Sequence, residues 1–90
     1  MKIHLDIKIF GQVQGVSFRA FVKKCADELN VKGFVENQAN NCVYIEAEGN
    51  KEEMKKFTEW CKAGPGFAKV EDIKTEEGKT KNYFRFEIRY

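Results

Sequence analysis

The chain has 90 residues, of which 42% are hydrophobic and 33% charged, and its formal net charge is +2. This length predicts one domain over residues 1–90, and the single proline and ordinary apolar content argue against a disordered chain. The weak net charge permits anionic partners without indicating nucleic acid, and no apolar run approaches the ~18 residues that span a bilayer.

The cysteines and the single histidine argue against a metal centre. Cys25, Cys42 and Cys61 are odd in number and have no CxxC spacing, which indicates reduced thiols in a cytoplasmic protein. Cys25 falls on an apolar stripe and is expected to be inert, whereas Cys42 is expected to point away from the core. His4 alternates onto the polar side of the first strand, so we expect a solvated histidine. The sequence therefore predicts neither a zinc site nor a cofactor.

The apolar pattern changes period several times along the chain. Alternation over residues 3–10 predicts a strand, and apolar residues at helical spacing between Phe18 and Leu29 predict a helix, with Ser17 as its N-cap and Asn30 as a left-handed residue at its end. The remaining expected elements are a strand over 31–37, an asparagine-containing turn over 38–41, a strand over 42–48, a helix over 51–62, a strand over 69–75, a polar loop over 76–82 and a last strand over 83–90.

This order is β-α-β-β-α-β with one further strand. Two helices at this length cannot cover both faces of a sheet, so both are expected on the isoleucine-rich side of the first strand. The pattern predicts an α+β, ferredoxin-like split β-α-β fold, with a mostly antiparallel sheet of four to five strands and two helices on one face.

A glycine-containing loop ends on a single arginine. The loop Gln14-Gly15-Val16-Ser17-Phe18 joins the first strand to the first helix, and Arg19 follows it in the first helical turn. Gly15 can adopt positive φ and turn backbone N–H groups inward, and a guanidinium can grip a phosphate with two parallel hydrogen bonds. A cation at a helix N-terminus opposes the helix dipole unless an anion lies between them, so Arg19 is read as an anion-binding residue rather than as an ordinary surface arginine.

Asn37 is the second candidate, at the end of the predicted second strand. It is explained equally well as a turn former or as an amide that orients a water molecule for attack on phosphorus. The chain contains no Walker loop, no HExxH and no pair of carboxylates within an apolar run.

Four segments resemble the acylphosphatase family. Residues 11–19 (GQVQGVSFR) are similar to its first signature, and residues 33–37 (GFVEN) to its second, with Phe34 in place of the usual tryptophan. Residues 64–70 and 86–90 are similar to its GP-x-x-A-x-V stretch and its C-terminal ending.

The resemblance implies a five-stranded sheet and hydrolysis of small acyl phosphates to a carboxylate and inorganic phosphate. It implies that Arg19 grips the phosphate, that Asn37 orients the water, and that the backbone of Gln14, Gly15, Val16, Ser17 and Phe18 cradles the phosphate.

Two other interpretations remain open from the residues. Lys32-Gly33-Phe34-Val35 resembles part of an RNA-recognition motif, although Glu36 stands where a stacking phenylalanine belongs. The fold could also be retained for a regulatory role without chemistry. The charged last strand favours a monomer.

Overall fold

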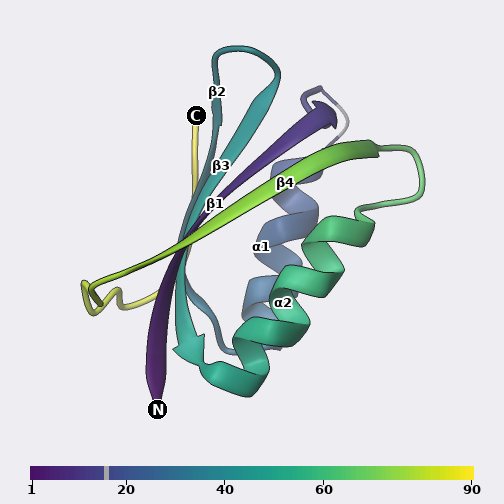
Figure 1. Cartoon of the computed structure of the whole chain (residues 1–90). Coiled ribbons are helices and arrows are strands. Elements are labelled where there is room, and N and C mark those ends of the chain that lie inside the picture. Colours follow the sequence, from purple (N-terminus) through teal and green to yellow (C-terminus); the bar gives the residue numbers. More distant parts are fainter. Residues whose placement is uncertain (16) are drawn as a thin grey trace.

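The computed structural model describes residues 1–15 and 17–90 (Figure 1). The elements are β1 (Lys2–Gln12), α1 (Phe18–Glu28), β2 (Lys32–Gln38), β3 (Cys42–Asn50), α2 (Lys51–Ala63), β4 (Lys69–Gly78) and β5 (Phe86–Arg89). The order of helices and strands is the predicted one.

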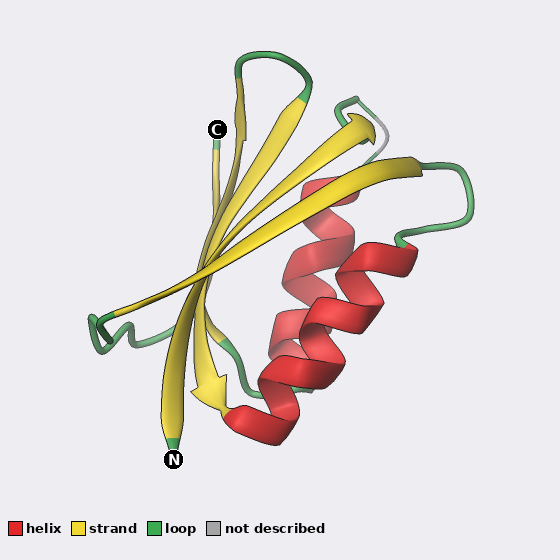
Figure 2. Ribbon diagram, in the orientation of Figure 1, coloured by secondary structure: helices red, strands yellow, loops and turns green. Residues whose placement is uncertain are grey.

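The strands form one sheet in the order β4-β1-β3-β2-β5. Every neighbouring pair is antiparallel except β2 and β5, which are parallel. Both helices lie on the same face of this sheet (Figure 2). The ferredoxin-like α+β prediction is therefore confirmed, with five strands.

The core lies between the helices and that face of the sheet. Period-two alternation places Ile7 and Ile9 of β1 on the helix side, where both are fully buried. Phe18 of α1 and Phe57 of α2 pack against them in the same cluster of buried residues. Neither helix in the described part of the chain has the length and apolarity needed to cross a membrane.

The β2–β3 hairpin turns through two asparagines. Asn40 and Asn41 have φ of 64° and 54°, the left-handed region that this tight turn requires and that asparagine tolerates. Asn30, with φ of 57°, ends the first helix as expected. The hairpin fixes where β2 ends, and Asn37 is one residue before that end.

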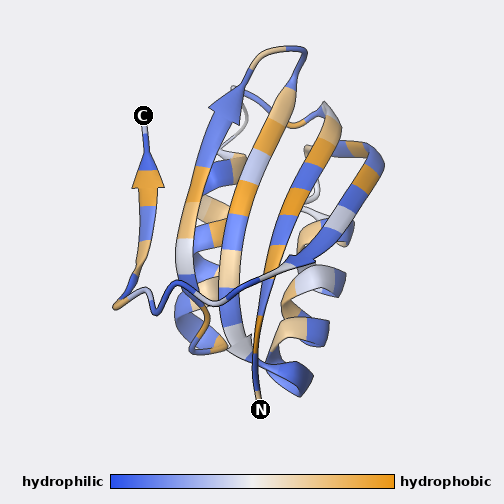
Figure 3. Ribbon diagram, turned by 60° about the vertical axis from the view of Figure 1, so that its left-hand side comes forward, coloured by the Kyte–Doolittle hydropathy of each residue, from blue (hydrophilic) through white to orange (hydrophobic). Residues whose placement is uncertain are grey.

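The C-terminal third differs from the prediction. β4 continues to Gly78 because it pairs with β1 as far as His4, so residues 76–78 belong to a strand rather than to the predicted loop. The last strand begins at Phe86 instead of residue 83. Residues 79–85 cross the sheet face that the helices leave open (Figure 3). The backbone N–H groups of Lys81 and Tyr83 donate to the Glu48 carboxylate there, which takes them out of strand pairing.

This crossing segment overturns the prediction for His4. The side chain does project from the face opposite the helices, but it is 2% exposed, because the ring of Tyr83 in the crossing segment stacks beside it. Cys25 is buried in the core as predicted. Cys42 lies outside the core cluster but is buried rather than facing solvent.

Candidate active site

The loop between β1 and α1 is built from left-handed residues. Gly15 has φ of +75°, and Ser17, the residue before α1, has φ of 59° and ψ of 27°. Ser17 is the predicted N-cap, yet its hydroxyl makes no capping hydrogen bond to the described residues. A left-handed serine costs on the order of 1 kcal/mol, and such strain is typical of ligand-binding loops. Val16, a predicted cradle residue, lies outside the described residues.

Arg19 reaches from the first turn of α1 to the end of β5. Its Nη1 donates a hydrogen bond of 3.1 Å to the backbone carbonyl of Arg89. The centre of its guanidinium lies 4.7 Å from the centroid of the Tyr90 ring, a cation–π distance. A guanidinium carries five N–H donors, so this anchoring fixes its plane and leaves donors for an anion.

Asn37 presents an unused acceptor. Its Oδ1 is buried and has no hydrogen-bond partner among residues 1–15 and 17–90. A buried carbonyl oxygen without a partner costs about 1–3 kcal/mol, and a donor that enters the site recovers that energy. A water molecule is such a donor.

Arg19 and Asn37 line the same pocket, although they are distant in sequence. Its volume is about 340 Å³. The other lining residues are Val13, Gly15, Ser17, Phe18, Ala20, Ile88 and Tyr90. The first turn of α1 contains no acidic side chain, so nothing there neutralises the positive end of the helix dipole. The pocket combines a helix N-terminus, a fixed guanidinium and an apolar wall.

The side chain of Gln14 holds the loop between β1 and α1 to the β2–β3 hairpin. Of the described residues, it is not among those lining the pocket. Its side-chain Nε2 instead donates to two backbone carbonyls, those of Gln38 at 2.7 Å and Cys42 at 2.9 Å. These carbonyls flank the hairpin turn just beyond Asn37. The Gln14 side chain therefore ties the loop that leads to Arg19 to the strand that carries Asn37.

Sequence reasoning missed the residues that hold Arg19. Arg89 and Tyr90 are distant in sequence from Arg19, and only the pairing of β5 with β2 brings them beside the pocket. Alternation predicted a strand there but gave no signal of which residue it would contact.

Sequence reasoning also missed a buried polar cluster on the sheet face opposite the helices. His4 donates toward Glu48 and Asp6, and Glu46 accepts from Lys81. Burial alone would lower the pKa of His4, but its hydrogen bonds to the two carboxylates raise it. Burial alone would raise the pKa of Glu46, but hydrogen bonds from Lys81 and two tyrosines bring it down to about 2. The cluster is charged and internally paired.

The comparisons with known proteins agree with this fold. The acylphosphatase family model matches residues 5–88. The acylphosphatase of Archaeoglobus fulgidus is 40% identical over 98% of this chain and 99% of its own length, and that of Ligilactobacillus salivarius is 44% identical over 93% and 94%.

The comparison with solved structures also finds acylphosphatases. The crystal structure of acylphosphatase from Bacillus subtilis superposes with a TM-score of 0.95 at 38% identity, and covers 98% of this chain and 99% of that one. Full-length HypF, solved in a phosphate- and nucleotide-bound form, matches all of this chain with 12% of its own, at a TM-score of 0.93 and 35% identity.

These matches define a small α+β phosphohydrolase. The chain belongs to the acylphosphatase family, and it is an enzyme that hydrolyses acyl phosphates.

Proposed function

We propose that the pocket formed by Arg19 and Asn37 is where this hydrolysis takes place, with the phosphate gripped by Arg19 and the attacking water held by Asn37. The observation that carries the proposal is the convergence of an anchored guanidinium and a buried, unpartnered amide oxygen on one pocket. The backbone N–H groups of the loop over residues 14–18 complete the cradle around the phosphate oxygens.

The reaction needs little beyond positioning. A water hydrogen points to Asn37 Oδ1, which aims the water oxygen at phosphorus. The new oxygen–phosphorus bond forms as the bond from phosphorus to the acyl oxygen breaks, and the acyl group leaves as a carboxylate. The water proton passes to a phosphate oxygen of the substrate. Phosphoryl transfer is governed by charge stabilisation and alignment, so no general base has to be added.

The proposal includes the setting of the enzyme. We take residues 1–90 as one cytoplasmic, monomeric domain that acts on a small acyl phosphate, with no metal ion or cofactor in the reaction and no nucleic acid as partner. Charged side chains on the edge strand β5 support the monomer.

The RNA-binding interpretation loses support in the structure. A base-stacking platform needs an open aromatic ring, but Phe34 is only 5% exposed. The Arg89 guanidinium lies over its ring at 3.6 Å, and Tyr83 packs against its edge.

The role of Arg19 is tested by Arg19→Ala. We expect kcat/KM for benzoyl phosphate to fall by about 10³-fold, as for loss of a charge-stabilising donor, and inorganic phosphate to lose its competitive inhibition. Arg85→Ala is the matched control, because Arg85 is exposed and pairs only with Glu87 among the described side chains. Assays with and without a chelator test the metal-free reaction. Wild-type turnover by Arg19→Ala would place the site elsewhere.

The role of Asn37 is tested separately by Asn37→Ala. The amide serves the water, so kcat should fall by about 10²-fold while the inhibition constant of inorganic phosphate stays near wild type. An equal loss of phosphate affinity would reassign Asn37 to the phosphate cradle.

A further inference from the structure

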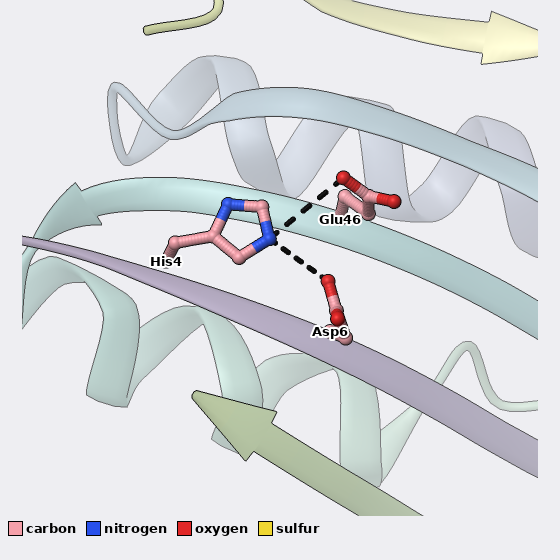
Figure 4. A group of neighbouring side chains, drawn as sticks. All are labelled: His4, Asp6 and Glu46. Carbon is pink, nitrogen blue, oxygen red and sulfur yellow. Dashed lines mark hydrogen bonds and ion pairs between the residues drawn. The ribbon is translucent and has the colours of Figure 1, made fainter. Parts of the chain in front are cut away.

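A histidine and two carboxylates converge on the sheet face opposite the helices (Figure 4). His4 Nε2 lies 2.8 Å from Asp6 Oδ1 and 3.7 Å from Glu46 Oε1. One donor atom from each of the three residues lies within 4.8 Å of the others. One nitrogen and two carboxylate oxygens at this separation are a donor set that suits a borderline divalent cation such as zinc.

The second nitrogen of His4 is held as it is in carboxylate–histidine–metal sites. His4 Nδ1 lies 2.7 Å from Glu48 Oε2, and both side chains are at most 2% exposed. This contact places a proton on Nδ1 and directs Nε2 toward Asp6 and Glu46. Glu48 is itself fixed by the backbone N–H groups of residues 81 and 83. The orientation of the ring is therefore built into the fold.

The charge of the cluster also favours a cation. Three carboxylates, from Asp6, Glu46 and Glu48, surround one imidazole. The lysines that approach them lie at the rim: Lys81 Nζ is 2.8 Å from Glu46 Oε1 with a side chain 56% exposed, and Lys2 Nζ is 3.8 Å from Glu48. Lys81 thus shows that the site attracts positive charge, and its exposed side chain can leave.

A route from solvent reaches the cluster. An open pocket of about 520 Å³ lies on the same face, lined by Asp6, Lys8, Gln38, Tyr44, Lys74, Thr75 and Glu76. Asp6 belongs to both the pocket and the cluster and is 36% exposed, so an ion entering the pocket meets one of the donors first. Glu76, paired with Asp6 across β1 and β4, adds a further carboxylate at the mouth.

We propose that His4, Asp6 and Glu46 bind a divalent metal ion of the zinc type, with Glu48 orienting His4 and Lys81 as the competing cation. The ion takes the place of the proton between His4 Nε2 and Asp6, and that proton goes to solvent. Because Glu48 also binds the backbone N–H groups of residues 81 and 83, the ion would secure the crossing segment over the sheet. It has no part in the reaction at Arg19.

The test is Co²⁺ and Zn²⁺ binding to the native protein at pH 8. Wild type should give cobalt d–d absorption with a stoichiometry of one, and Zn²⁺ should displace it and raise the melting temperature. Asp6→Asn should abolish the cobalt spectrum. This residue is partly exposed, so the variant remains folded where His4→Gln, at a buried position, can unfold.

Lys81→Met should change the affinity for Co²⁺ in the opposite direction. Removing the competing ammonium should tighten Co²⁺ binding about fivefold relative to Lys79→Met, an exposed lysine of the same segment. Absence of binding to wild type, or binding that survives in Asp6→Asn, overturns the proposal. So does a thiolate-to-cobalt band in the near ultraviolet, because it would place the ion on a cysteine.

Discussion

Gln14 links the two halves of the candidate active site, and Gln14→Leu removes that link while keeping the side-chain volume close to the original. The lost contacts are the hydrogen bonds of 2.7 Å to the Gln38 carbonyl and 2.9 Å to the Cys42 carbonyl. A hydrogen bond contributes about 0.5–1.5 kcal/mol net. The Gln38 carbonyl is at the exposed end of the hairpin and can bond to water instead, whereas the carbonyl of buried Cys42 is less accessible. We therefore expect a loss of about 1–2 kcal/mol of unfolding free energy.

The assay combines urea unfolding with kinetics. A loss of that size lowers the melting temperature by roughly 10 °C in a domain of this length. Gln14→Leu should also lower kcat more than it raises KM, because the strand end that carries Asn37 is no longer tied to the loop that leads to Arg19.

Gln12→Leu is the matched control, since Gln12 is an exposed glutamine at the end of β1. Surface changes of this kind normally stay within about 0.5 kcal/mol. If Gln14→Leu matches Gln12→Leu in both urea midpoint and kcat, the link has no energetic role and the reasoning fails.

Three further outcomes are expected. Gly33→Ala should destabilise the fold by about 3 kcal/mol or more, because φ at Gly33 is +143° and the new Cβ would lie 1.8 Å from the Glu46 carbonyl oxygen. The control is Gly66→Ala, which has open space around the new Cβ and should melt at the wild-type temperature. Burial raises the pKa of all three cysteines, so at pH 8 a smaller fraction of them is thiolate in the native protein than in the unfolded chain. Iodoacetamide should therefore label urea-unfolded protein but not native protein. Fast labelling of the native protein would contradict this. Tyr90→Ala should weaken inhibition by inorganic phosphate about fivefold, because Arg19 loses its stacking partner, and an unchanged inhibition constant would show that the ring has no such role.

Local patterns predicted most of the fold because each depends on neighbours in the chain. Alternation in β1 and β3 reports which face of the sheet is buried, and asparagine at positive φ reports a tight turn. The segment over residues 79–85 could not be predicted in this way. It is held by bonds from Lys81 and Tyr83 to carboxylates of β3, more than thirty positions away, and it looks like a polar loop by composition.

His4 shows the same limit for a single residue. Its place in the alternation is correct, since it does project from the polar face. Alternation cannot report what covers that face, however, and the crossing segment turned an expected surface histidine into a buried one. Glu46, a ligand of the proposed metal site, could not be found from spacing either, because it comes from a different strand.

The site itself was more predictable, because strand directions bring its parts together. β1 and β2 are both antiparallel to β3, so they run in the same direction, and β5 is parallel to β2. The carboxyl ends of these three strands therefore lie at one edge of the sheet. The loop that leads to Arg19 follows β1, Asn37 is near the end of β2, and Tyr90 follows β5. A short motif after one strand and a single asparagine near the end of another thus had to meet once the topology was right. The anchoring of Arg19 by Arg89 and Tyr90 follows from the same geometry, so the end of β5 orients the guanidinium on which phosphate binding is proposed to depend.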